Sequence, residues 1–224
     1  LNTGSWGSQP RPVYRRLTAV LRELQGSPTV RRAALRERAA GSRRRLAAFL
    51  GVAAEDLAFT VNVTVAVNMA VHGLDWRPGD EILASDQEYG AIDNALHHAS
   101  RRYGVVVRRA AIPAVPSGPD EIVAALEAAL TDRTRLLLSS HVTTRTGVIM
   151  PIKRLAALAH GRGALLAVDG AHAPGMIPLD LSDLGADYYA GNCHKWLCAP
   201  KGTGFLHARP EVQERLHHLI VSWG

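Results

Sequence analysis

The segment ALLAVDGAHAPG, residues 164–175, and the segment DYYAGNCHKWLCAPKGTGFL, residues 187–206, decide how the chain is expected to fold. The apolar residues 164–168 predict a buried strand that ends at Asp169. A short strand over 188–190 then leads to Lys195, and the glycines after it predict turns. In parallel sheets, ligands bind beyond the carboxyl ends of the strands. The two segments therefore predict a shared pocket that contains Asp169 and Lys195.

Strand and helix patterns alternate along the rest of the chain. This alternation predicts an α/β fold with three layers, a mostly parallel sheet with helices on both faces. We expect strands at 57–61, 81–84, 105–109, 135–139, 164–168, 188–190 and 204–207, and helices at 64–71, 91–103, 119–130, 152–161 and 210–219.

The first fifty residues have a different pattern. Residues 1–10 are punctuated by Gly and Pro and predict an extended arm, and helices are expected over about 12–25 and 30–50. Candidate core residues of the second helix are Leu35, Leu46, Phe49 and Leu50, and Gly51 is its expected stop. The expected domains are residues 1–50, an N-terminal arm with helices, and residues 51–224, a larger α/β domain.

The basic charge of the chain is local. The formal net charge is +6, but residues 11–45 hold eleven arginines against two acids, and the rest holds 15 Lys+Arg against 18 Asp+Glu. No groove-reading motif accompanies the arginines, so we interpret them as a solvated or subunit-facing surface and expect no nucleic-acid partner. No apolar run approaches the roughly 20 residues of a membrane helix, and no signal segment opens the chain, so we expect a cytoplasmic location and no membrane partner.

Four kinds of group that pyridoxal 5′-phosphate (PLP) requires have candidates here. Lys195 offers an amine for the aldehyde, Asp169 a carboxylate for the pyridine nitrogen, and Tyr89 a ring to stack on the pyridine. The Asn62-Val63-Thr64 turn offers helix N–H groups for the phosphate. Each has an ordinary alternative: a surface lysine, a helix cap, a core tyrosine and a common strand–helix turn. No metal site is expected, because the adjacent Cys193 and His194 lack a ligand spacing.

The chain resembles the class V PLP-dependent aminotransferases (fold type I), and within them the isopenicillin N epimerase-like branch. The resemblance rests first on AVDGAHAPG and DYYAGNCHKWLCAPKGTGFL and covers essentially the whole chain. Further matching stretches are LNTGSWG (1–7), FTVNVTVAVN (59–68), SDQEYGA (85–91), SHVTTRTG (140–147) and VSWG (221–224).

The resemblance implies PLP as cofactor, a homodimer and a role for each matching residue. Lys195 resembles the lysine that forms the Schiff base, Asp169 the partner of the pyridine nitrogen, and His172 the residue near the phenolic oxygen. Thr143 is a second candidate near that oxygen, and Tyr89 resembles the stacking ring. The implied phosphate cradle consists of Val63, Thr64, Asn192 and His194.

The chain also departs from the family pattern. Arg145 stands where the family often has Pro, and Asn192-Cys193 where it commonly has small residues. Family members continue past VSWG into a smaller C-terminal domain that carries a substrate-carboxylate arginine, whereas this chain ends at Gly224. We therefore expect a large domain with an incomplete substrate pocket.

The resemblance implies a reaction at Cα of a small amino-acid substrate through an external aldimine. We expect an epimerase of secondary metabolism, with a C–S (β-elimination) lyase or an aminotransferase as alternatives. An inactive fragment is an alternative of another kind. A cysteine desulfurase is less favoured, because that chemistry needs a cysteine on a mobile loop, whereas Cys193 and Cys198 flank the lysine and suit small core positions.

Overall fold

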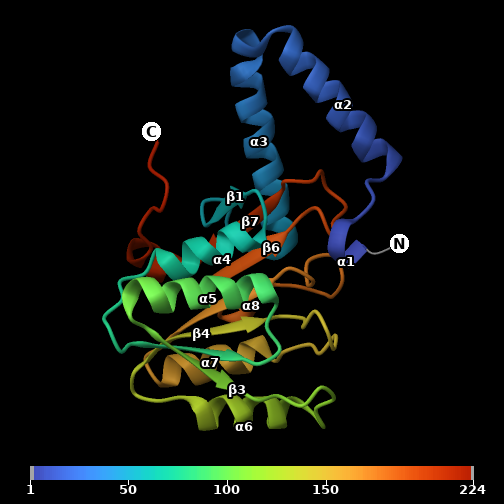
Figure 1. Ribbon diagram of the computed structural model, residues 1–224. Coiled ribbons are helices and arrows are strands. Elements are labelled where there is room, and N and C mark those ends of the chain that lie inside the picture. Colours follow the sequence, from blue (N-terminus) through green and yellow to red (C-terminus); the bar gives the residue numbers. More distant parts are fainter. Residues whose placement is uncertain (1–2, 223–224) are drawn as a thin grey trace.

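The computed structural model describes residues 3–222 (Figure 1). The outermost residues of the LNTGSWG and VSWG motifs, 1–2 and 223–224, lie outside the described part. The described residues form one seven-stranded sheet with the order β1-β7-β6-β5-β4-β2-β3. The strands are β1 (Leu57–Thr60), β2 (Glu81–Ser85), β3 (Val106–Ala110), β4 (Thr134–Ser140), β5 (Leu165–Gly170), β6 (Tyr188–Asn192) and β7 (Gly204–Ala208).

Five neighbouring strands of the sheet are parallel. β3, β2, β4, β5 and β6 pair in parallel, whereas β7 runs antiparallel to both β6 and β1. The connections between the parallel strands pass through helices, as such strands require. The expected α/β class with a mostly parallel sheet is confirmed.

Helices cover both faces of the sheet and form two hydrophobic cores. Side chains alternate between the faces along a strand, so Leu136 and Leu138 of β4 join one core and Leu137 joins the other. α4 (Val63–His72) and α5 (Gly90–Tyr103) cover the first face. The second face carries α6 (Pro119–Ala129), α7 (Ile152–Gly161), α8 (Leu181–Leu184) and the end of α3 (Pro28–Leu50).

The ends of β5 and β6 are built on small residues that face large rings. Gly170 pairs with Gly191 across the two strands. A Cβ at Gly170 would overlap the ring of Tyr189, and one at Gly191 would overlap the ring of Phe205. The two rings stack with an interplanar angle of 7° and are fully buried. The two glycines therefore make room for these rings at the ends of β5 and β6, where the polar loops begin.

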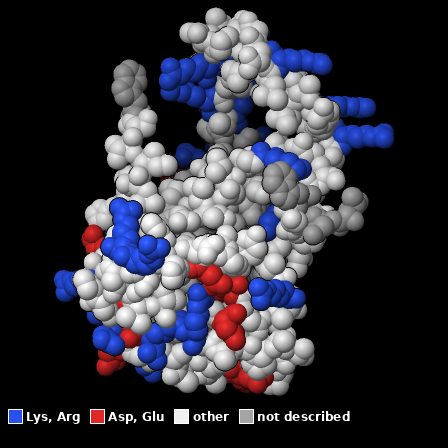
Figure 2. Space-filling model, viewed as in Figure 1, with Lys and Arg blue, Asp and Glu red and all other residues white. Residues whose placement is uncertain are grey.

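The N-terminal helices form a hairpin that projects from the sheet (Figure 1). α2 (Arg11–Gly26) and α3 contact each other, and none of the described residues of α2 is buried. Figure 2 shows blue Lys and Arg side chains gathered over this hairpin. Gly51 ends α3 in the left-handed conformation at φ 74°, as expected. Among the described helices, none combines the length and the apolar character that crossing a bilayer demands.

Several local expectations were wrong. The arm over residues 1–10 is not wholly extended, because α1 (Thr3–Trp6) is a helical turn. The expected helix over 210–219 is a shorter 3₁₀ helix, Pro210–Arg215. The chain is no longer helical at His217, whose N–H donates to Gly73 O. Phe49 is 54% exposed, because Ala47 and Leu50 take the buried side of α3.

Replacement of Gly170 by Ala is expected to destabilise the chain. The new methyl group would enter the space of the Tyr189 ring in a core that has no room for it. Overpacking of this kind costs about 1–3 kcal/mol, and each kcal/mol lowers Tm by roughly 2–4 °C in a chain of this size. Gly161→Ala is the matched control, since nothing lies within 4 Å of its Cβ position. Thermal unfolding with equal Tm values for the two variants would contradict the packing argument.

Candidate active site

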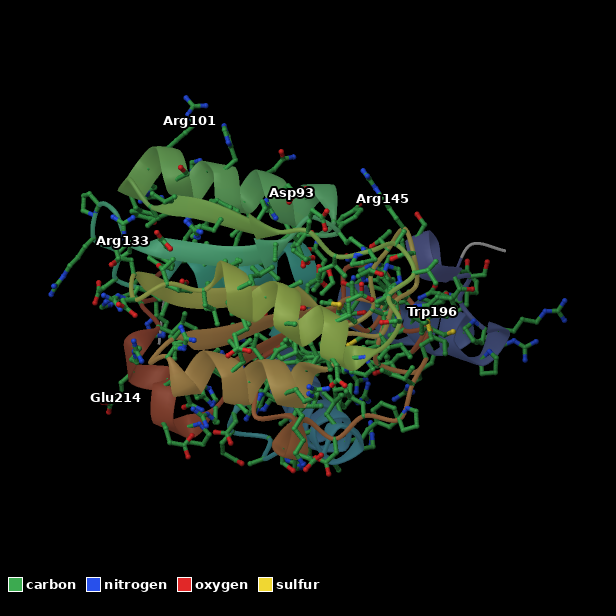
Figure 3. All side chains as sticks on the ribbon, turned by 90° about the horizontal axis from the view of Figure 1, so that it is seen from below. Asp93, Arg101, Arg133, Arg145, Trp196 and Glu214 are labelled. Atoms are coloured by element: carbon green, nitrogen blue, oxygen red, sulfur yellow. The ribbon has the colours of Figure 1, made fainter. Side chains whose placement is uncertain are left out.

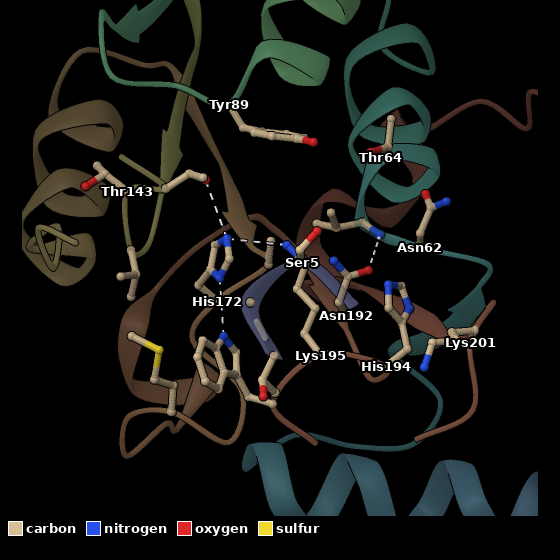
Figure 4. A pocket seen from close by; sticks show the side chains of 18 of the residues that line it. Ser5, Asn62, Thr64, Tyr89, Thr143, His172, Asn192, His194, Lys195 and Lys201 are labelled. Atoms are coloured by element: carbon tan, nitrogen blue, oxygen red, sulfur yellow. Dashed lines mark hydrogen bonds between the residues drawn. The ribbon is translucent and has the colours of Figure 1, made fainter. Parts of the chain in front are cut away.

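A cavity of about 840 Å³ opens at the carboxyl ends of β4, β5 and β6 (Figure 4). The loops after these strands bring residues 142–144, 171–172 and 194–196 to its wall. α1 and the first residues of α4 close other sides. Every residue predicted for the cofactor site lines this cavity except Asp169, which lies buried at the end of β5.

Lys195 lies in a tight turn after β6. The N–H of Cys198 donates to Lys195 O at 3.1 Å, which closes the turn. The Lys195 Nζ atom lies 3.3 Å from His172 Nε2. Burial lowers the pKa of the Lys195 amine, and the nearby Asp169 carboxylate opposes that effect. Lys195 is therefore a partly buried amine that is closer to its nucleophilic free form than a surface lysine.

Asp169 is the last residue but one of β5 and is 3% exposed. Its Oδ1 atom accepts a hydrogen bond from the N–H of Ala171 at 2.8 Å, and among the described residues Oδ2 has no hydrogen-bond donor. Burial raises the pKa of this carboxyl, and Lys195 opposes the rise. The helix-cap alternative is wrong, because the residues after Asp169 form a turn and not a helix. A buried carboxylate with an open oxygen favours a cationic partner.

His172 contacts three side chains in the cavity. The Trp196 indole N–H donates to His172 Nδ1 at 3.3 Å, while His172 Nε2 faces Lys195 Nζ and lies 3.5 Å from Thr144 Oγ1. Burial, assisted by the charge of Lys195, lowers the pKa of His172 to about 4. Thr143 lines the cavity, but its hydroxyl bonds within its own loop, to Thr146 Oγ1 at 2.6 Å. Thr144 is thus the threonine that contacts His172.

The start of α4 forms the far end of the cavity. Asn62 caps the helix by accepting from the N–H of Val65, and the N–H of Val63 donates to Asn192 Oδ1 at 2.9 Å. The Asn192 side-chain oxygen is thereby occupied, while Asn192 and Thr64 both line the cavity. A helix N-terminus with hydroxyl and amide donors is suited to an anion.

Two basic side chains lie on the same wall. His194 Nδ1 donates to Thr203 O at 2.9 Å, so its Nε2 is the nitrogen that remains for a ligand. Lys201 also lines the cavity, and its Nζ donates to Gly7 O. Sequence reasoning missed Lys201, although it is one of three lysines and comes six residues after Lys195.

Tyr89 precedes α5 and has its side chain 48% exposed, so it is not a core tyrosine. Figure 4 shows Tyr89 on one side of the cavity and His172 with Lys195 on the other. Arg145 is exposed and projects outward from the ribbon, at the same end of the molecule as Trp196 (Figure 3). Burial raises the pKa of the Cys193 thiol to about 11, which keeps this sulfur in its unreactive protonated form.

The N-terminal segment packs directly on the lysine turn. A Cβ at Gly7 would lie 2.8 Å from Lys195 O, and a Cβ at Gly4 would lie 3.3 Å from atoms of both His172 and Trp196. Sequence reasoning did not connect this segment with the pocket. The two glycines of TGSWG were the available signal, because glycine permits such close approach.

Glu88 is a buried carboxyl that sequence reasoning also missed. Its Oε1 accepts from Ser85 Oγ, and its Oε2 accepts from the N–H of Ser140 at 2.9 Å and from Ser140 Oγ at 2.6 Å. Burial raises the pKa of Glu88 to about 7, the hydrogen bonds from the serines oppose that rise, and Asp169 adds to it. Two carboxyl groups, those of Asp169 and Glu88, thus lie behind the pocket. Both oxygens of Glu88 accept hydrogen bonds, whereas only one oxygen of Asp169 does so among the described residues.

The donor set of the cavity fits PLP. A primary amine and a helix N-terminus flanked by basic side chains line one cavity, and a buried carboxylate with an open oxygen lies behind it, near the amine. These groups match the aldehyde, the pyridine nitrogen and the phosphate of that molecule.

The sequence matches the family model of the class V aminotransferases over residues 7–222. The chain therefore belongs to the class V aminotransferase family, a family of PLP-dependent enzymes. The resemblance drawn from the motifs is confirmed.

Named relatives lie within this family. The chain is 45% identical to the isopenicillin N epimerase of Amycolatopsis lactamdurans over 227 positions, which cover 100% of the chain and 57% of that protein. Its fold matches a mutant of C-DES with glycine covalently linked to the PLP cofactor, with a TM-score of 0.94 and 28% identity. The match covers 99% of this chain and 59% of that protein. It also matches a complex of the cystine C–S lyase C-DES with its product cysteine persulfide, with a TM-score of 0.94 and 29% identity. That match covers 99% of this chain and 60% of C-DES. The chain thus spans less than two thirds of each relative.

Glu88→Gln is expected to flatten the pH dependence of stability between about pH 5 and 7. Because the folded-state pKa of Glu88 is raised, the folded chain binds a proton there that the unfolded chain has lost, so stability falls as pH rises through this window. The lost stability is up to about 3 kcal/mol, and Gln, which stays neutral, avoids it.

Urea unfolding at pH 5, 6, 7 and 8 measures this difference. Glu55→Gln, at an exposed position, is the control and should keep the wild-type slope. If the free energy of unfolding changed with pH by the same amount in wild type and in Glu88→Gln, Glu88 would not titrate between these pH values.

Proposed function

We propose that the chain is the PLP-binding part of an enzyme that epimerises an amino-acid substrate at Cα, in the manner of isopenicillin N epimerase. The observation that carries the proposal is the contact of Lys195 Nζ with His172 Nε2, at 3.3 Å, in a cavity backed by buried Asp169. The 45% identity to an isopenicillin N epimerase over the whole chain supports epimerisation in secondary metabolism as the reaction.

In the proposal, each wall of the cavity has one task. Lys195 would hold the cofactor covalently, Asp169 would face its pyridine nitrogen, and Tyr89 would cover its ring. His172, with Thr143 as the second candidate, would lie near its phenolic oxygen. The phosphate would lie against Val63, Thr64, Asn192 and His194, with Lys201 beside them. When bound, PLP supplies an electron-accepting ring that stabilises negative charge at Cα.

Lys195 would also move the proton, because the substrate amine would take its place on the cofactor and leave Nζ as a free amine. Its lowered pKa leaves a larger fraction of free amine near neutral pH, which can accept the Cα proton as a general base. The neighbouring His172, which stays neutral because of its own lowered pKa, adds no positive charge that would hold back this step. Return of a proton to the opposite face of Cα gives the epimer.

The proposal extends to the assembly. A homodimer and a smaller C-terminal domain in the full-length enzyme rest on the family resemblance. The division into residues 1–50 and a PLP-binding domain, 51–224, rests on the change of sequence pattern after the first fifty residues, and a cytoplasmic location is the expectation drawn from the sequence. The chain spans 57% of the epimerase, so the substrate pocket would be completed elsewhere in the full-length protein.

A C–S lyase is the second candidate. The TM-score of 0.94 to the cystine C–S lyase C-DES favours it, and both reactions need the same lysine, carboxylate and phosphate site. The two reactions differ in the step after the Cα proton is lost: a proton returns in epimerisation, whereas a β-substituent leaves in elimination.

Lys195→Ala is expected to abolish covalent attachment of PLP. Wild-type chain incubated with PLP and then reduced with borohydride should carry a phosphopyridoxyl group on the Lys195 peptide, found by mass spectrometry and by the absorption of the protein. Lys153→Ala is the control, because Lys153 is exposed and pairs with Asp183. Labelling that survives in Lys195→Ala would remove Lys195 from this role, and absence of labelling in wild type would favour an inactive fragment.

An experiment in deuterated water distinguishes the two candidate reactions by their products. We expect the PLP-loaded full-length enzyme to place solvent deuterium at Cα of its amino-acid substrate and to invert the centre while every substituent is retained. Chiral chromatography with mass spectrometry measures both effects. Release of a thiol or persulfide together with a keto acid would instead assign the C–S lyase reaction.

A further inference from the structure

The contact between Trp196 and His172 fixes where the histidine carries its proton. The indole Nε1–H has no lone pair and can only donate. It lies 3.3 Å from His172 Nδ1, with the two rings tilted by 60°. Nδ1 must therefore be the acceptor nitrogen of the imidazole. Burial keeps the ring neutral, so its one proton belongs on Nε2.

That proton faces the amine of Lys195. His172 Nε2 lies 3.3 Å from Lys195 Nζ and 3.5 Å from Thr144 Oγ1. A free amine has a lone pair that accepts a hydrogen bond, whereas an ammonium group has none. An Nε2–H directed at Nζ is thus matched to the free amine. The other tautomer, with Nε2 bare, would be matched to the ammonium form.

Packing holds the Trp196–His172 pair in place. α1 lies against both rings, since a Cβ at Gly4 would be 3.3 Å from His172 Cε1 and from Trp196 Cζ2. On the other side, a Cβ at Gly175 would lie 3.0 Å from the backbone carbon of Trp196. α1 therefore limits the movement of both rings on one side, and the segment at Gly175 packs against the backbone of Trp196.

We propose that Trp196 is a positioning residue, whose indole N–H holds His172 in the Nε2–H tautomer and so directs a hydrogen-bond donor at the free amine of Lys195. The inference concerns the cofactor-free chain and does not require the proposed reaction. Its consequence for the proposed function is a lysine kept ready for the aldehyde of PLP.

The charged and titratable groups around Lys195 decide whether its amine is free or protonated. Asp169 opposes the free amine, because its carboxylate raises the pKa of Lys195, but burial lowers that pKa by more. The other titratable side chains that line the cavity are Tyr89, His172, His194 and Lys201. Among them His172 is the one in direct contact with Nζ, so its tautomer can decide the balance.

Nuclear magnetic resonance of the cofactor-free chain tests the proposal. The chain has three lysines, so ¹³C,¹⁵N-labelled lysine gives three side-chain titrations, with Lys153 and Lys201 as internal references. In Trp196→Phe, which keeps an aromatic ring but removes the donor, we expect His172 to shift toward the Nδ1–H tautomer. The pKa of Lys195 should then rise by about one pH unit, because Nε2 becomes an acceptor for the ammonium.

Trp76→Phe is the matched control. Trp76 also donates its indole N–H, to Val71 O at 2.7 Å, in another part of the chain, so its loss should leave Lys195 unchanged. Wild-type ¹⁵N spectra, assigned with His172→Gln, report the tautomer without the tryptophan variant and decide the case if Trp196→Phe fails to fold. A proton on Nδ1 in wild type, or equal Lys195 titrations in wild type and a folded Trp196→Phe, would overturn the proposal. Failure of PLP to label Lys195 would affect the proposed function alone.

Discussion

Burial of the Asp169 carboxylate is the constraint around which the pocket is arranged. A carboxylate removed from water at the end of a central strand is costly unless it meets positive charge or hydrogen-bond donors. The described structure gives it the N–H of Ala171 and the proximity of Lys195. Burial also moves its neighbours toward their neutral forms: it favours the protonated form of Glu88 and the neutral forms of His172 and Lys195, although Asp169 itself favours the charged amine of Lys195. A pocket of this kind is prepared for a ligand that brings its own cation to the carboxylate.

The sheet keeps Asp169 and Lys195 together. Asp169 pairs with Ala190 across β5 and β6, and Lys195 lies in the turn that follows β6. The glycines at the ends of both strands leave room for the rings of Tyr189 and Phe205, because a Cβ at either position would overlap a ring. The position of the lysine turn thus depends on core packing as much as on polar contacts. Tight packing of this kind transmits small changes in volume to the site.

Much of this arrangement could be predicted from the sequence. Apolar runs that end in Asp169 and in the residues before Lys195 indicated the strands, and the alternation of strands and helices indicated the class of fold. The polar residues after β4, β5 and β6 could be assigned to one edge because parallel strands end on the same side. Glu88 could not be assigned, because a polar residue after a strand is usually exposed and its burial depends on Ser140 of a strand 52 residues away. Nor could the contact of the N-terminal segment with the lysine turn, because Gly7 and Lys201 are 194 residues apart in the sequence.

The same reasoning explains why the residues that bind a cofactor do not by themselves define the reaction. In the proposed function, Asp169, Lys195 and the start of α4 would contact the pyridine nitrogen, the aldehyde and the phosphate of PLP, which are the same whichever reaction follows, so an epimerase and a lyase would need them equally. The reactions would be distinguished by the groups around Cα and the substrate side chain, for which the candidates are the α1 segment that lines the cavity and the parts of the longer relatives that this chain does not span. Trp196 lies at the boundary of the two sets, because it contacts His172 on the cofactor side and packs against α1. Differences in substrate between relatives should therefore be sought first in the residues that meet Trp196 and α1.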